Sequence, residues 1–205
     1  MEVMHPLKPI YDNNSKVLIL GTIPSVKSRE AGVYYANPRN RFWKTLSKVY
    51  EEEIGESDEE RINFLLKNNI ALFDVLKSCD IKASSDTSIK NPIPNDLLPI
   101  IKSSKIEYIF TTGKKAYELY NKYSYKKTGI KATSLPSPSP ANCKKGIEEL
   151  LYKEYYQIKK LTNKWVILMF FYLLRLFRNI HEILCFFLLP NSQVFLLLLL
   201  VLLIW

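Results

Sequence analysis

Residues 17–43 have the sequence VLILGTIPSVKSREAGVYYANPRNRFW. The four apolar residues 17–20 stand between a polar segment and Gly21, a pattern that predicts a strand buried on both faces of a parallel sheet. Gly21, Pro24 and Ser25 then give a small, rigid turn after this strand. Because open α/β sheets bind ligands at the carboxyl ends of their strands, we expect the turn to line a binding site.

The second half of this stretch mixes aromatic rings, amides and cations. It contains Tyr34, Tyr35, Asn37, Arg39, Asn40, Arg41, Phe42 and Trp43. Aromatic faces stack on bases, and cations contact the phosphates that link them. The mixture therefore favours a nucleic-acid ligand.

Composition and charge agree with such a ligand without requiring it. At 205 residues, 47% hydrophobic and 24% charged, the chain can form one domain with a sizeable core and an additional segment. The net charge is +9, and the acidic run at residues 51–60 leaves the rest of the chain more basic still. This charge favours a polyanionic partner, although a basic domain without any nucleic-acid role fits it equally well.

The cysteines exclude several classes of protein. Cys79, Cys143 and Cys185 are too few and too far apart for a disulfide framework, a CxxC metal site or a four-thiolate iron–sulfur cluster. Residues 1–10 lack the apolar run of a secretory signal. We therefore expect a protein of the reducing cytoplasm, and the sequence indicates no metal, nucleotide or redox cofactor.

Strand and helix patterns alternate along the chain. Strands are expected at residues 17–20, 70–75, 106–110 and 130–135, with helices between them, among them 40–50 and 96–102. Ser57 and Glu60 form a capping box ahead of a helix that ends near residue 67. The polar connection 84–95 cannot be regular helix because of its two prolines, and Asn95 is expected to cap the helix after it.

A second proline-rich segment, LPSPSPAN at residues 135–142, follows the fourth strand. Its prolines remove backbone donors and fix φ, so it must be a stiff loop. Ser139 or Asn142 can cap a final helix at 143–160, whose first turn would present Lys144 and Lys145 to a phosphate. A connector selected only for rigidity is the alternative interpretation.

The segment from Gly21 to Ser28 does not form a nucleotide-binding phosphate loop. Lys27 and Ser28 fit the end of the G-x-x-x-x-G-K-S pattern, but Val26 stands in place of its second glycine. Pro24 also removes a backbone amide that an anion-binding nest needs.

The turn GTIPS, the loop LPSPSPAN and the segment YYANPRNRFW between them together resemble the uracil-DNA glycosylase superfamily, most closely its hypoxanthine (deoxyinosine) branch. The resemblance covers about residues 5–160. It implies an α/β fold, a three-layer αβα sandwich around a four-stranded, mostly parallel sheet. It also implies that a base flipped out of DNA enters a pocket between the two proline-rich motifs.

Two departures from the family pattern bear on the chemistry. Uracil-excising branches carry Asp or Asn in the first motif to orient water, where this chain has Ile23, and many relatives have His where Leu135 stands. The resemblance implies that in the hypoxanthine branch an Asn outside the first motif orients the water instead, and the candidates are Asn40 and Asn37. Asn40 can instead cap the following helix, and Asn37 can close a turn before Pro38.

The reaction itself sets the remaining requirements. Purine release passes through an oxocarbenium-like sugar, so water must lie opposite the base and the leaving base needs hydrogen-bond donors. An amide can position water but is no strong base, so the rate depends on positioning. We expect the base to meet the first turn and an aromatic face, and DNA to meet the basic and second-loop residues. These are, for the base, Gly21, Thr22, Pro24, Ser25, Tyr35 and Phe42, and for DNA, Arg39, Arg41, Ser137, Pro138, Ser139, Lys144 and Lys145. Tyr35 and Phe42 can instead belong to the core, an alternative that the apolar side of the helix favours for Phe42. Asp74, at the end of the second strand, either touches the site or caps the next segment of the chain.

Residues 161–205 differ in composition from the rest. They are mostly apolar, and residues 194–205 carry no charge. No uninterrupted run reaches the roughly 18–20 residues that span a bilayer, although 165–189 would do so with its charges paired. We expect a glycosylase-like domain at 1–160 and a hydrophobic helical tail at 161–205, which is either a membrane anchor or an extension without selected function.

Two functional hypotheses remain. In the first, the protein is a monomeric, monofunctional DNA glycosylase that removes a deaminated base, hypoxanthine above all. In the second, it keeps the fold and the basic surface but is catalytically weak and only binds DNA, with the tail tethering it to a membrane. Loss of DNA affinity with salt is expected in both cases and does not separate them.

Overall fold

The computed structural model describes residues 2–82 and 85–162, all within the compact unit Met1–Asn163. From residue 163 onward the expected hydrophobic tail lies outside the described residues. Within the described ranges, no helix has the length and apolar character needed to cross a membrane.

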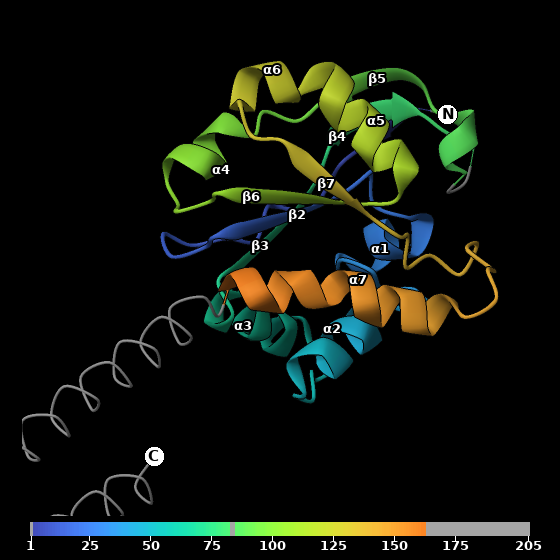
Figure 1. Cartoon of the computed structure of the whole chain (residues 1–205). Coiled ribbons are helices and arrows are strands. Elements are labelled where there is room, and N and C mark those ends of the chain that lie inside the picture. The colour runs from blue at the N-terminus through green and yellow to red at the C-terminus, as the bar shows by residue number, and fades with distance from the viewer. Residues whose placement is uncertain (1, 83–84, 163–205) are drawn as a thin grey trace, which may run out of the picture. The chain divides into compact units, whose positions relative to one another are not determined.

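A four-stranded parallel sheet forms the centre of the fold (Figure 1). Its strands, in the spatial order β3-β2-β6-β7, are β2 (Val17–Gly21), β3 (Ile70–Asp74), β6 (Tyr108–Thr112) and β7 (Ala132–Leu135). β2 lies between two partners and all five of its residues are buried, as its uninterrupted apolar run predicts. The predicted sheet is confirmed, with the strand bounds displaced by at most two residues.

Helices cover both faces of this sheet, which confirms the three-layer αβα architecture (Figure 1). One layer holds α2 (Phe42–Tyr50), α3 (Asp58–Lys67) and α7 (Ile147–Thr162), and the other holds α4 (Leu98–Lys102), α5 (Lys114–Tyr123) and α6 (Tyr125–Thr128). α2 buries Phe42, Leu46 and Val49 along one side, the face that its period predicts. A short helix, α1 (Val26–Ala31), follows the first proline-rich turn and was not expected from the sequence.

The start of α3 shows how local sequence fixes an element. Ser57 Oγ accepts the Glu60 N–H, and Glu60 Oε2 accepts the Ser57 N–H at 3.1 Å, which completes the predicted capping box. Such a cap stabilises the helix by about 1 kcal/mol.

A second, antiparallel sheet is absent from the sequence-based prediction. It consists of β1 (Glu2–Met4), β4 (Leu76–Asp80) and β5 (Lys90–Pro94), in the order β1-β4-β5. β5 and the 3₁₀ turn Asp86–Ser88 fall in the polar connection. The prolines in β5 are tolerated because it is an edge strand with irregular pairing to β4, where a missing N–H disrupts little.

The expected capping role of Asn95 is wrong. Its Nδ2 donates to the backbone oxygen of Asp74 at 2.9 Å, so it ties the connection to the end of β3. α4 begins at Leu98, whose N–H is accepted by Asp96 Oδ1 at 3.1 Å.

Candidate functional site

The turn GTIPS after β2 and the loop LPSPSPAN at the end of β7 meet at the carboxyl end of the parallel sheet. β2 ends beside β3, with Gly21 opposite Asp74, and β6 ends beside β7, with Thr112 opposite Leu135. The turn after β2 and the loop after β7 line the same pocket, of about 120 Å³, through residues 21–25 and 137–139. These two segments thus bring together seven of the residues predicted for the site, namely Gly21, Thr22, Pro24, Ser25, Ser137, Pro138 and Ser139.

The first turn is held by its own serines. Ser25 Oγ accepts the Ser28 N–H at 3.3 Å and caps α1. Ser28 Oγ in turn accepts the N–H of Ala36 at 3.3 Å, which links the turn to the aromatic segment that follows. These hydrogen bonds therefore hold residues 22–25, which form one wall of the pocket, in position.

The two candidate asparagines lie in different places. Asn40 lines the pocket and also a neighbouring hollow, whereas Asn37 lines that hollow but not the pocket. Asn40 Oδ1 accepts the Phe42 N–H at 3.0 Å at the start of α2, and Asn37 Oδ1 accepts the Arg39 N–H at 3.0 Å. Asn37 thus closes the turn that its structural interpretation predicts, whereas Asn40 is not the cap of α2, because Arg41 occupies the cap position and the helix has no side-chain cap. Asn40 in addition reaches the pocket that would hold a base.

Tyr35 and Phe42, which were both expected to contact the base, differ in their positions. Tyr35 lines the pocket, and its hydroxyl lies 3.1 Å from Thr112 Oγ1. Phe42 is fully buried and is not part of the pocket wall, so the expected contact between Phe42 and a base is wrong. It stacks under Tyr35, with ring centroids 3.8 Å apart and planes inclined by 14°. Phe42 therefore acts on the pocket through the position of the Tyr35 ring.

Tyr35 is also conformationally unusual. Its φ of 53° lies in the left-handed region, which is uncommon for an aromatic residue and concentrates at turns and functional sites. Burial, with the charge of Asp74 as the second cause, raises the pKa of its hydroxyl far above the ordinary value. The hydroxyl therefore stays protonated and can donate at any physiological pH.

The side chains of Arg39 and Arg41 also have different surroundings. Arg41 Nη1 donates to the Ser139 oxygen at 3.0 Å and to the Asn142 oxygen at 3.4 Å, and its backbone N–H donates to the Pro138 oxygen at 3.0 Å. These bonds hold the second loop against the start of α2. Arg39 is exposed and lines the hollow beside the pocket, where a DNA strand can reach it.

The expected phosphate site at the start of the final helix is wrong in its geometry. α7 begins at Ile147, so Lys144 and Lys145 are exposed residues of the preceding loop and not of a first helical turn. Asn142 Nδ2 donates to the Ser137 oxygen at 3.0 Å, and Ser139 Oγ accepts the Ala141 N–H at 3.2 Å. Both side chains therefore stabilise the loop itself, and neither caps the start of α7.

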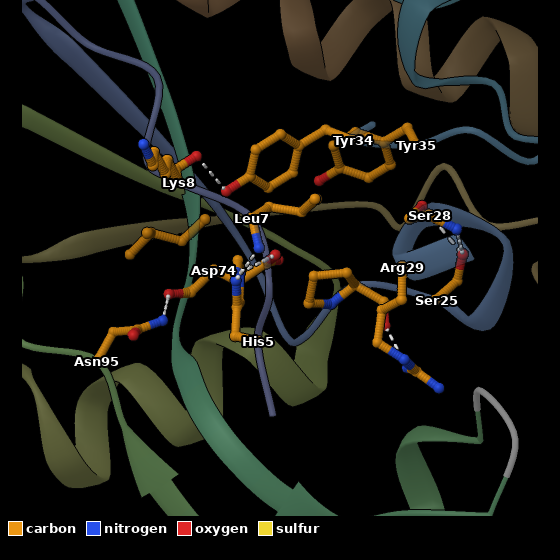
Figure 2. A network of polar contacts seen from close by, with 12 residues as sticks. His5, Leu7, Lys8, Ser25, Ser28, Arg29, Tyr34, Tyr35, Asp74 and Asn95 are labelled. Atoms are coloured by element: carbon orange, nitrogen blue, oxygen red, sulfur yellow. Dashed lines mark hydrogen bonds and ion pairs between the residues drawn. The ribbon is translucent and has the colours of Figure 1, made fainter. Parts of the chain in front are cut away.

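One polar contact of the site, between two buried side chains, was not expected from the sequence. Asp74 lines the pocket, and its Oδ2 lies 2.8 Å from Nε2 of His5, a residue 69 positions away (Figure 2). Their side chains are only 6% and 2% exposed. No local pattern marks His5, because its partner is fixed only when the N-terminal segment packs beside β3.

A second carboxylate also reaches the pocket. Asp86 lines it from the connection between β4 and β5, and Thr22 Oγ1 donates to Asp86 Oδ2 at 3.5 Å. The residue as a whole is exposed, and its carboxylate contacts the pocket residue Thr22. Burial of that carboxylate, and to a smaller degree the charge of Asp74, raises its pKa, while Thr22 and Lys115 lower it.

Taken together, the pocket offers an amide, hydroxyls, an aromatic face and carboxylates. Across residues 2–82 and 85–162, no cluster of three or more His, Cys, Asp or Glu side chains could hold a metal ion. The arrangement can enclose a planar polar ring and place water beside it.

The sequence of this chain is similar to those of known proteins. Residues 9–160 match the family model described as the uracil DNA glycosylase superfamily. A hypoxanthine DNA glycosylase of Methanosarcina acetivorans is 32% identical over 135 residues, which is 65% of this chain and 84% of the relative. A hypoxanthine DNA glycosylase of Methanosarcina barkeri is 32% identical over 113 residues, 54% of this chain and 71% of the relative.

A solved structure agrees with these sequence matches. The solution NMR structure of a candidate uracil DNA glycosylase from Methanosarcina acetivorans superimposes with a TM-score of 0.65 and 29% identity. The match covers 78% of this chain and 99% of that one. The chain belongs to the uracil DNA glycosylase superfamily and is a DNA glycosylase, which hydrolyses N-glycosidic bonds in DNA.

Proposed function

We propose that this DNA glycosylase acts on deoxyinosine and releases hypoxanthine from DNA by base flipping. Both named relatives are hypoxanthine DNA glycosylases, and the family match at residues 9–160 includes the pocket. Hypoxanthine also pairs weakly with its partners, so extruding it costs less than the few kcal/mol needed for a sound base pair.

The observation that carries this proposal is the position of Asn40. Its side chain stands at the boundary between the base pocket and the hollow that contains Asn37 and Arg39. A base in the pocket would leave its sugar near this boundary, where the attacking water must lie. Asn40 Oδ1 accepts one hydrogen bond from Phe42, which orients the amide, and a carbonyl oxygen retains a second lone pair for water.

The motif positions that other branches use support this assignment. Ile23 lines the pocket where relatives carry a water-orienting Asp or Asn, and its side chain cannot bind water. Leu135 is 1% exposed and belongs to the core, so it offers nothing to a departing base. Among the polar groups of the pocket, we assign the water to the amide of Asn40 and a contact with the base to the protonated hydroxyl of Tyr35.

DNA would approach along the hollow beside the pocket. Arg39 is exposed there, and Lys144 and Lys145 are exposed on the loop that follows the second motif. Phosphate contacts of this kind position the duplex and make binding salt-dependent, whereas the pocket selects the base.

The test is base release by the full-length protein from duplexes that contain hypoxanthine, uracil, xanthine or only sound bases, with alkaline cleavage of the abasic product. Asn40→Ala is expected to lower hypoxanthine release by about 100-fold with DNA binding retained. Asn37→Ala is the matched control, since it loses the same kind of contact to a backbone N–H two residues on but does not reach the pocket. Equal activity of wild type and Asn40→Ala would remove Asn40 from the mechanism.

Ile23 and Leu135 also keep a second candidate function open, that of a catalytically weak DNA-binding member of the same fold. In that case the wild type binds the duplexes but releases no base from any of them. Hypoxanthine release that depends on Asn40 excludes this candidate.

A further inference from the structure

One side chain of α7 contacts the groups that support two parts of the pocket lining. Tyr35 and residues 137–139 of the second loop line the pocket. The Tyr155 hydroxyl donates to the backbone oxygen of Pro136, directly before these loop residues, at 3.2 Å. The Tyr155 ring lies edge-on against Phe42, with centroids 6.4 Å apart, and Phe42 in turn stacks with Tyr35. Tyr155 is therefore connected to the loop directly and to the Tyr35 ring through Phe42.

The second loop is held through its backbone oxygens. The prolines at 136 and 138 have no N–H, so donors from other parts of the chain must fix the loop there. The backbone oxygen of every residue from 135 to 139 accepts a hydrogen bond of 3.2 Å or less. The donors, in the order of these acceptors, are the Gly113 N–H, the Tyr155 hydroxyl, the Asn142 amide, the Arg41 N–H and the Arg41 guanidinium. Among these donors, Tyr155 is the one that reaches the loop from α7.

Tyr155 is itself fixed well enough to act as a support. α7 buries Leu151, Tyr155 and Ile158 at helical spacing, and Tyr155 is 0% exposed. Burial, with Tyr35 as the second cause, raises the pKa of the Tyr155 hydroxyl well above its ordinary value. The hydroxyl therefore stays protonated and donates to the Pro136 oxygen at any physiological pH.

We propose that Tyr155 is a positioning residue for base release, which fixes the second loop through its hydroxyl and supports the Tyr35 ring through Phe42. The inference deepens the proposed function and rests on it for the base that is released. Because both contacts come from one buried side chain, they fix the distance between the loop and the Tyr35 ring, and so the space in which a flipped base is held. Placement of this kind determines the rate, since a misplacement of about 1 Å can lower it by about 100-fold.

A purely structural role is the alternative for this hydroxyl. A buried carbonyl that loses its partner is costly wherever it lies. Tyr50 offers the comparison, because it is a buried tyrosine of the same helical layer whose hydroxyl lies 2.9 Å from Thr162 Oγ1, and it is not part of the pocket lining. Tyr50 joins α2 to α7, whereas Tyr155 joins α7 to a loop that lines the pocket.

The first variant, Tyr155→Phe, removes the hydroxyl and keeps the ring. The single-turnover rate of hypoxanthine release and the affinity for the same duplex are measured with full-length protein. We expect the rate to fall by about 10-fold with the affinity unchanged, because the loop loses its bond at Pro136 while the residues that contact DNA phosphates remain. Tyr50→Phe also loses a buried hydroxyl contact, and we expect its rate to equal that of wild type. Equal losses of rate in the two variants, or an unchanged rate in Tyr155→Phe, would overturn the proposal.

The second variant, Tyr155→Leu, removes the ring as well and tests the contact with Phe42. Its rate should fall by about 10-fold beyond that of Tyr155→Phe, because the Tyr35 ring loses the support behind it. Phe64→Leu is the control for loss of a buried ring, since Phe64 packs against Tyr50 and is not part of the pocket lining. If Tyr155→Leu is no slower than Tyr155→Phe, or if Phe64→Leu is equally slow, the ring has no part in positioning and the proposal is wrong.

A wild type that releases no base refutes the proposed function, and amide hydrogen exchange then decides this inference by itself. The Ser139 N–H donates to Ser137 Oγ, and the Ala141 N–H donates to Ser139 Oγ, so both report on the order of the second loop. We expect their exchange to be about 10-fold faster in Tyr155→Phe than in Tyr50→Phe. Equal exchange in these two variants would show that Tyr155 does not hold the loop.

Discussion

Gly21 lies against Asp74 so closely that a Cβ atom on residue 21 would overlap the carboxylate oxygen Oδ1. The backbone of the first motif therefore lies in direct contact with the carboxylate at the end of β3, and the two together form the floor of the pocket. Glycine is required here for close approach and not for an unusual φ, since Gly21 is absent from the positive-φ residues of the described chain.

Replacing Gly21 with alanine should consequently abolish base release. The added methyl group must displace Asp74 or the end of β2, and overpacking of this kind costs about 1–3 kcal/mol of unfolding free energy. Gly129→Ala is the control: its φ of 70° strains the alanine, but no atom lies within 4 Å of the new Cβ. We expect Gly129→Ala to lose about 1 kcal/mol with its activity intact. Urea unfolding and base release measure both effects.

Arg39 and Arg41 should respond differently to replacement with alanine. Arg39 is exposed beside the pocket, so Arg39→Ala should weaken binding to all duplexes alike and reduce the slope of log affinity against log salt by about 1, without loss of stability. Arg41→Ala removes two bonds to the second loop and should lower stability by about 1 kcal/mol and slow base release. If the slope of log affinity against log salt changed in Arg41→Ala and not in Arg39→Ala, Arg41 and not Arg39 would be the residue that contacts DNA phosphates.

Phe42 should affect base release without touching the base. Phe42→Leu removes the ring on which Tyr35 stacks and should lower the unfolding free energy by about 1–3 kcal/mol. It should also raise KM for hypoxanthine DNA, because the Tyr35 ring loses its support. Phe64→Leu is the control, since that buried ring packs edge-on against Tyr50 and does not line the pocket. Equal effects on KM in both variants would show that only general stability matters.

The sequence predicts the parallel sheet and the meeting of the two motifs because both are encoded locally. The apolar run at 17–20 specifies a doubly buried strand, and the prolines at 136, 138 and 140 specify a rigid loop. The carboxyl ends of parallel strands all lie at the same end of the sheet, so the loops that follow these strands must lie there too. Asn40 is a candidate only through the resemblance to the hypoxanthine branch, since the residues alone favour a cap at the start of the following helix.

The remaining features depend on contacts that no local pattern encodes. His5 meets Asp74 across 69 residues, and β5 forms in a proline-containing stretch only because β4 offers it an edge. Burial explains the misplacement of Phe42: its ring lies in the core beneath Tyr35, and periodicity alone does not show which of the two rings lines the pocket. The expected start of α7 is too early because Asn142 and Ser139 bond within their own loop.

Stability should depend on pH through Asp86. Burial, as the larger cause, raises the pKa of this carboxyl above its ordinary value of 3.8 in the folded protein, so the folded state holds the proton more tightly than the unfolded chain does. The unfolding free energy therefore falls as pH rises from 3.8 through the raised pKa, and the ionised carboxylate destabilises the fold at all higher pH. Asp86→Asn removes this penalty and should be more stable than wild type at pH about 7, with the difference shrinking as the pH approaches 3.8. Urea unfolding of both proteins across this range measures it, and a difference that stays constant with pH would show that lost hydrogen bonding to Thr22, and not ionisation, determines the effect.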